Sequence, residues 1–69
     1  MNLREVELGR EYVIDSVVTD DELDAFLFSL GCYSGEPVTV ISRRHSSLII
    51  VLKDVRYSID ARLAEAIRV

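Results

Sequence analysis

Very few side chains in this sequence could perform chemistry. The single cysteine, Cys32, and the single histidine, His45, are the only soft metal ligands and the only thiol and imidazole that could form a nucleophile and its base. One of each gives no ligand spacing of the kind that a closed zinc or iron site needs. We therefore expect no catalytic site, no metal and no cofactor. We interpret Cys32 as a small apolar residue and His45 as a solvated loop residue.

Four acids near residue 20 are the other candidates for chemistry: Asp20, Asp21, Glu22 and Asp24. Clustered carboxylates could hold a hard cation. However, Thr19 and Glu22 have the spacing of a capping box, in which each side chain accepts a hydrogen bond from the other residue's backbone N–H. The acids would also lie at the positive end of the helix dipole. We therefore predict a helix that begins here and is stabilised by these acids, rather than a metal site.

The apolar residues that follow predict how this helix packs. They have the i, i+3, i+4, i+7 spacing of one stripe, which we expect to face the core: Leu23, Phe26, Leu27 and Leu30. Gly31 then supplies the left-handed conformation that ends many helices. Phe28 lies roughly on the opposite side at ~100° per residue, either covered by a loop or exposed for contact.

Short runs of apolar and β-branched residues, some of them alternating with polar residues, predict the strands. These runs are Glu11–Val18, Val38–Arg43, Leu48–Lys53, Val55–Ile59 and Ile67–Val69. Gly35 and Asp54 mark turns, and Asp60 can cap a short helical turn before the last strand. Because Leu48 to Leu52 is apolar at every position, we expect both faces of that strand to be covered, within the barrel or by a partner.

These elements predict the fold class and the setting of the protein. About five short strands, an inserted helix and a late helical turn indicate a mainly β protein, and a sheet this short avoids exposed edges best as a small SH3-like barrel. A chain of 69 residues has room for one domain, residues 1–69. It has no signal-peptide pattern, and its longest apolar run is five residues, Leu48 to Leu52. We expect a cytoplasmic protein that does not insert into a membrane.

The charge is unevenly divided along the chain. The net charge is −4, but residues 1–36 carry nine acids and two bases, giving −7, while residues 37–69 carry six bases and three acids, giving +3. The two halves either neutralise each other in the fold or form a dipolar surface that orients the protein on a partner. Nucleic acid is not favoured as a ligand, because Arg43 and Arg44 are the only adjacent basic pair.

The order of these elements and several motifs resemble the FeoA family, small cytosolic proteins associated with the bacterial ferrous iron transporter FeoB. The resemblance is carried by Leu30-Gly31 at the helix end, Gly35, and the alternating Val38 to Val40. A terminal apolar pattern adds to it: Ile59, Ala64, Ile67 and Val69. It extends from about Leu3 to Val69. The sequence departs from the family pattern at Cys32, at Asp54, in the Arg43 to Ser47 loop and in the acids and aromatics of the helix.

The resemblance implies a non-enzymatic interaction module that binds the cytosolic part of FeoB and modulates iron uptake. The residues that we expect to contact the partner are Phe28, Tyr33, Arg43, Arg44 and His45. The alternative is a self-associating or metal-responsive barrel like the C-terminal domain of iron-dependent repressors, with Leu48 to Leu52 at a homo-oligomer interface.

Overall fold

Six strands and two helices make up the fold, as seen in the computed structural model, which describes residues 1–69. In chain order they are β1 (Glu11–Val13), β2 (Ser16–Val17), α1 (Asp21–Leu30), β3 (Pro37–Arg43), β4 (Ser47–Leu52), β5 (Val55–Asp60), α2 (Ala61–Ala66) and β6 (Ile67–Arg68). The predicted mainly β fold, with one inserted helix and a helical turn before the last strand, is confirmed.

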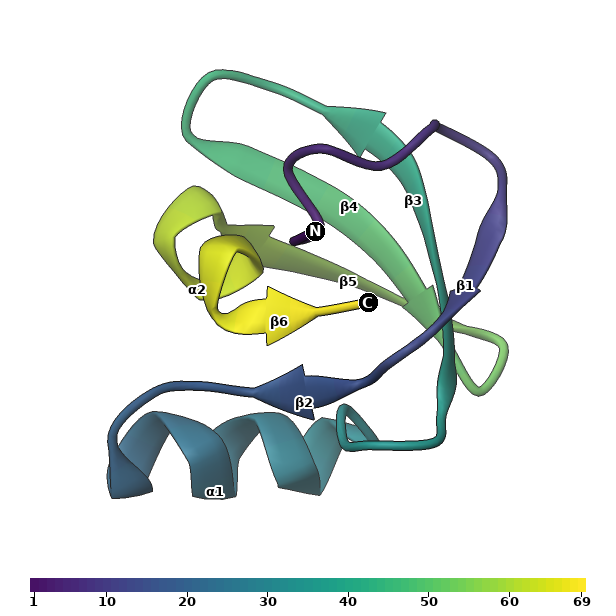
Figure 1. The fold of residues 1–69 in the computed structure, drawn as a ribbon. Helices are drawn as coiled ribbons and strands as arrows, with labels where there is room; N and C mark the ends of the chain where they lie inside the picture. The colour runs from purple at the N-terminus through teal and green to yellow at the C-terminus, as the bar shows by residue number, and fades with distance from the viewer.

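The strands form two antiparallel sheets that together make the small barrel (Figure 1). The larger sheet has the order β1-β3-β4-β5, and β2 pairs with β6. The predicted first strand, Glu11–Val18, is therefore two strands. It breaks because the chain changes partner: the Ile14 N–H donates to the Glu36 carbonyl at 2.9 Å, and the Asp15 N–H donates to the Arg68 carbonyl at 2.7 Å.

The core lies between the two sheets and is entirely apolar, with no buried polar or charged residue. Alternate residues of the central strands supply its centre: Val38, Val40, Leu48, Ile50 and Leu52. On the other face of β4, Ile49 and Val51 are half-buried. The expectation that both faces of β4 are covered is thus met fully on the inner face and only partly on the outer face. The reason is that α2 and the β2–β6 sheet lie over the inner face and not over the outer one (Figure 1).

Positive backbone φ angles occur at the predicted turns. Gly31 has a φ of 92° and ends α1 in the left-handed conformation, and Gly35 has a φ of 91° before β3. Lys53 and Asp54, with φ of 50° and 66°, form the two-residue connection between β4 and β5. The turn predicted at Asp54 is confirmed, and so is the cap of α2, where the Asp60 carboxylate accepts from the Arg62 N–H at 2.6 Å.

The N-terminus of α1 differs from the predicted capping box. The N-cap is Asp20, whose carboxylate accepts a hydrogen bond from the Leu23 N–H at 2.9 Å. Thr19 therefore precedes the cap, and Glu22 is one residue too early to reach back to it. An aspartate carboxylate is at least as good an N-cap acceptor as a threonine hydroxyl, so the helix begins one residue later than the box predicts.

The predicted core-facing stripe of α1 is also wrong in large part. Leu27 is the only buried side chain of the helix and Leu30 is half-buried, whereas Leu23 is 38% exposed and Phe26 is 50% exposed. Figure 1 shows the reason: α1 lies along the outside of the molecule next to β2, a strand of two residues. So narrow a sheet covers one line of side chains and leaves the flanks of the stripe in water.

Candidate docking site on α1

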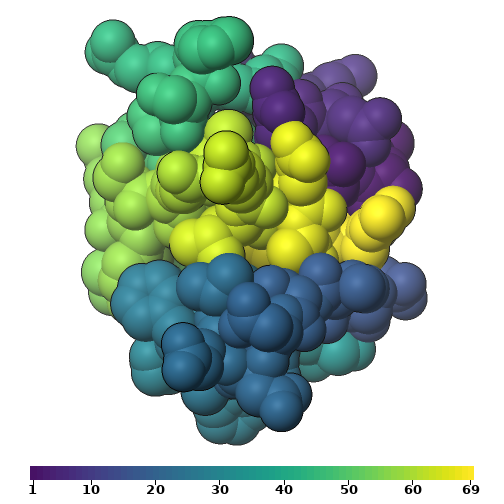
Figure 2. Space-filling view, turned by 90° about the vertical axis from the view of Figure 1, so that its left-hand side faces the viewer, coloured from purple at the N-terminus to yellow at the C-terminus, as the bar shows by residue number.

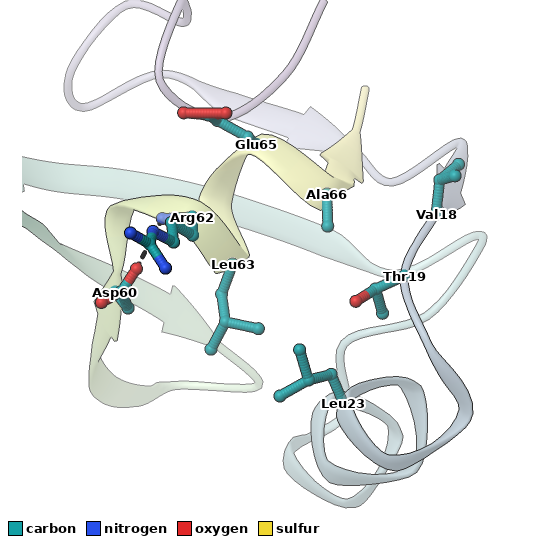
Figure 3. Close-up of a pocket in the computed structure, with 8 residues that line it drawn as sticks. All are labelled: Val18, Thr19, Leu23, Asp60, Arg62, Leu63, Glu65 and Ala66. Carbon is teal, nitrogen blue, oxygen red and sulfur yellow. Dashed lines mark hydrogen bonds between the residues drawn. The ribbon is translucent and has the colours of Figure 1, made fainter.

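A groove separates the beginning of α1 from α2. It has a volume of about 520 Å³ and is lined by four hydrophobic residues, Val18, Leu23, Leu63 and Ala66, and four polar ones, Thr19, Asp60, Arg62 and Glu65. In Figure 3 the Leu23 and Leu63 side chains point toward each other across it. In the space-filling view of Figure 2, α2 and the segment from β2 to α1 lie one above the other on the face turned to the viewer.

Local structure explains why these residues meet. The Val18 N–H donates to the Ala66 carbonyl at 2.8 Å, which ties the segment before α1 to the end of α2. The Asp20 cap then places Leu23 in the first turn of α1, and the Asp60 cap does the same for Leu63 in α2. Two helix starts that lie side by side therefore each direct a leucine into the groove (Figure 3).

The charges around the groove are mostly negative. Glu65 pairs with Arg4 at 2.6 Å, and Asp60 is occupied by its capping hydrogen bond. Arg62 forms no ion pair. On the α1 side, Asp21, Glu22 and Asp24 also form no ion pair, and the helix contains no basic residue. The α1 side thus carries carboxylates that nothing in the chain neutralises at close range.

Phe28 and Tyr33, two of the residues predicted to contact a partner, come together at the other end of α1. Phe28 is 63% exposed, and its ring centroid lies 4.8 Å from that of Tyr33. The Lys53 ammonium donates to the Tyr33 hydroxyl at 2.8 Å and lies 4.0 Å from a Glu36 carboxylate oxygen. The hydrogen bond to Tyr33, and then the charge of Glu36, raise the pKa of Lys53. Phe28 is therefore an exposed ring supported on one face.

Arg43, Arg44 and His45 lie elsewhere, at the connection between β3 and β4. All three residues are exposed, but the Arg43 guanidinium also donates to the Val6 carbonyl at 2.8 Å. Seven residues of β3 separate this loop from the α1 end, about 20 Å at strand spacing. Figure 1 shows α1 and this loop at opposite ends of the molecule. The five predicted contact residues therefore form two separate groups rather than one surface.

The groove itself was not foreseen from the sequence. Leu23 belongs to a stripe that predicts burial, and Leu63 lies in a helix of only six residues with too few positions to show a pattern. The one sequence feature that could have indicated the groove is Val18, an apolar residue just before the acidic segment. In the structure this residue is 66% exposed. Only the pairing of β2 with β6 brings these residues together.

The two residues considered for chemistry are far apart. Cys32 follows α1 and is 1% exposed, and burial together with the nearby Asp24 charge raises the pKa of its thiol to about 11. His45 is exposed at the opposite end of β3. No three His, Cys, Asp or Glu side chains gather into a metal-binding group.

Neither helix has the length and apolar character needed to cross a membrane.

Several solved structures share this fold. A crystal structure of an iron uptake regulatory protein, FeoA, has a TM-score of 0.88 and 22% identity, covering 97% of this chain and 91% of its own. FeoA of Stenotrophomonas maltophilia, solved with zinc and described as a prokaryotic SH3 domain protein, has a TM-score of 0.84 and 23% identity, covering 97% and 86%. A manganese-dependent transcriptional repressor has a TM-score of 0.87 and 16% identity, covering 97% of this chain but only 39% of the repressor.

These likenesses establish the fold, and the predicted SH3-like barrel is confirmed. No curated protein matches the chain. The family itself is shown by the sequence: the FeoA domain family matches it from residue 1 to residue 69. The resemblance that the sequence motifs indicated is therefore confirmed, and the chain belongs to the FeoA domain family.

Proposed function

We propose that this chain is a cytoplasmic accessory module that binds the cytosolic part of a FeoB ferrous iron transporter and modulates iron uptake by contact, without catalysis of its own. Membership of the FeoA domain family supports this proposal. So does the description of the Stenotrophomonas maltophilia relative as a candidate activating factor of ferrous iron transport. The module occupies residues 1–69 as one domain.

The observation that carries the proposal is the set of exposed apolar side chains along α1. Four of the eight large hydrophobic residues that the structure exposes lie on this helix or just before it: Val18, Leu23, Phe26 and Phe28. A single exposed apolar residue needs no explanation, but a group of them on one element is typical of a surface that binds another protein. Tyr33 adds to this set at the C-terminal end of α1, because its ring supports the Phe28 ring.

The basic loop contributes separately. Arg44 and His45 are exposed at the end of the molecule away from α1, so they would contact only an acidic part of the partner that extends this far. Arg43 is the last residue of β3 and lies next to this loop, but its hydrogen bond to the Val6 carbonyl commits it to holding the N-terminal segment. We therefore expect α1 to supply most of the binding and Arg44 to affect it weakly.

Binding of the full chain to the purified cytosolic part of FeoB from the same organism tests the proposal. We expect saturable binding that weakens about tenfold in Phe28→Gln, since burying an aromatic ring contributes that much or more. Val13→Gln is the matched control, because Val13 is 61% exposed but lies on β1. No saturable binding by the unaltered chain would refute the proposed function, and equal losses in the two variants would refute the assignment to α1.

A further inference from the structure

We propose that the groove between α1 and α2 receives an amphipathic helical segment of a partner protein, whose apolar side chains enter the groove and whose Lys and Arg residues face the acids of α1. This inference rests on the proposed function in one respect, that a protein partner docks on α1. It adds the site and the chemistry of the segment that docks.

The shape and lining of the groove favour apolar side chains. Its volume of about 520 Å³ falls within the range of protein pockets that bind ligands. Val18 and Leu23 still expose 66% and 38% of their surface, so an occupant would remove substantial apolar area from water. Leu63 and Ala66 form the opposite wall, which leaves an open slot between two short helices (Figure 3). A helix with an apolar face fits such a slot, as in other helix-in-groove complexes.

The charge around the slot selects a basic segment. Residues 18–24 and 60–66, which contain the whole lining, carry six acids and one base, giving −5, whereas the entire chain carries −4. The rest of the molecule is therefore slightly positive. Helix capping uses the Asp20 carboxylate alone, and Asp21, Glu22 and Asp24 form no ion pair. A segment with Lys or Arg beside its apolar face would pair with these acids, and an acidic segment would be repelled.

The single cation of the lining gives the complex a direction. Arg62 lies on the α2 side of the groove and forms no ion pair. It is therefore available to a carboxylate, or to the free carbonyl groups at the C-terminus of the docked helix. The basic side of the segment would then face α1, and an acidic or C-terminal group would face α2.

A model peptide tests the groove independently of any transporter. The probe is a helical peptide of about 15 residues with leucines at i, i+3, i+4 and i+7 and lysines along the edge of this leucine stripe, long enough to hold some helix. The control probe has glutamate in place of lysine. Binding to the isotope-labelled full chain is followed by NMR. We expect the lysine peptide to shift the amide signals of Val18, Leu23, Leu63 and Ala66, and the glutamate peptide to leave them unchanged.

Two matched pairs of variants make the test specific. Val18→Gln should weaken binding of the lysine peptide about tenfold, and Val13→Gln, with nearly the same exposure on β1, should not. Asp21→Asn with Glu22→Gln should weaken it about fivefold at low salt and less at high salt, whereas Glu11→Gln with Asp54→Asn should not. Retained helical circular dichroism shows that each variant is folded.

The outcomes separate this inference from the proposed function. Signals that shift outside the groove, equal effects within either pair of variants, or no saturable binding of the lysine peptide would each overturn the inference. If the peptide binds as expected but the cytosolic part of FeoB does not, the groove stands and the proposed partner is wrong. If FeoB binds and Val18→Gln binds it equally well, the partner stands and the groove is not its site.

Discussion

Cys32 shows how burial alone determines the chemistry of a residue. Its side chain is packed among the apolar core, and the loss of water raises the pKa of the thiol from 9.0 to about 11, with a smaller contribution from the Asp24 charge. The thiolate, which is the form that attacks electrophiles and binds metals, is therefore scarce near neutral pH. Cys32 behaves as the small apolar residue that its lack of any partner motif predicts.

The same shift predicts a loss of stability at high pH. Between about pH 9 and 11 the unfolded chain releases the thiol proton while the folded chain keeps it, so the free energy of unfolding should fall by up to roughly 3 kcal/mol across this range. Below pH 9 both states keep the proton, so this group causes no change of stability with pH there. Urea denaturation of the unaltered chain and of Cys32→Ala across this range measures it. The difference between the two curves should shrink as pH rises, and parallel curves would contradict the assignment.

Gly31 and Gly35 offer a second comparison between single residues. Both have φ near +90°, but a Cβ on Gly31 would lie 3.2 Å from two carbons of the Lys53 side chain, whereas a Cβ on Gly35 would meet nothing within 4 Å. Each change to alanine should cost about 1 to 2 kcal/mol for the left-handed backbone, and Gly31→Ala should cost more. Urea denaturation checks this. The extra loss of stability in Gly31→Ala should disappear in a Lys53→Ala background. Equal losses in Gly31→Ala and Gly35→Ala would show that the lysine side chain moves aside freely.

At the scale of elements, α1 depends on its cap and on one buried leucine. The Asp20 carboxylate makes the only side-chain hydrogen bond to the first turn, and Leu27 is the only fully buried side chain of the helix, with the half-buried Leu30 packed against the core one turn later. This attachment leaves most of the helix surface free, which is what a docking element needs. The acids of the first turn stabilise the helix and at the same time give its surface a negative charge.

Substitutions at two adjacent residues test which one caps α1. Asp20→Ala should destabilise the protein by about 1 kcal/mol, because the Leu23 N–H loses its acceptor. Thr19→Ala should cost less than about 0.5 kcal/mol, since its side chain makes no hydrogen bond within the chain. Thermal denaturation followed by circular dichroism compares them. A larger effect at Thr19 would restore the capping box that the sequence pattern indicates.

At the scale of the whole molecule, the barrel closes through its two chain ends. Ile67 is fully buried in β6, which pairs with β2, and the Val69 N–H donates to the Met1 carbonyl at 2.9 Å. The same closure places α2 beside α1 and so forms the groove. Stability and the candidate docking site therefore depend on the same short pair of strands.

Removing side-chain volume at this closure should be costly. Ile67→Ala should lower the free energy of unfolding by about 3 kcal/mol, because it leaves a cavity in the core. Val69→Ala is the control: this residue is half-buried, and its link to Met1 is through the backbone, so its loss should be much smaller. Urea denaturation compares the two. If Ile67→Ala lowers the free energy of unfolding as little as Val69→Ala does, β6 contributes little to closure.

The alternative of a self-associating barrel also belongs to this scale. β4 lies between β3 and β5, so its edges are already paired, and only Ile49 and Val51 on its outer face could reach a second copy. Sedimentation of the full chain, with and without ferrous or manganous ion, measures whether such an interface forms. A monomer that is unaffected by either ion would contradict this alternative.

Local patterns determined much of this protein. Runs of apolar and β-branched residues identified every strand region, Gly31, Gly35 and Asp54 identified turns, and spaced motifs indicated the FeoA family. These features depend on neighbouring residues along the chain, which is why the sequence alone reveals them. The exposed ring of Phe28 was foreseen as one of two alternatives for the same reason, since a position off the helix stripe follows from periodicity.

Only the tertiary structure decided what the helix stripe contacts and where the site lies. The sequence pattern shows that Leu23 and Phe26 share a side with Leu27, but it does not show that a two-residue strand is all that lies beneath them. Nor does it show that Phe28 and Arg44 are at opposite ends, or that Val18 and Leu63 face one groove. Burial and proximity depend on contacts between segments distant in sequence, and the pairing of β2 with β6 creates these contacts.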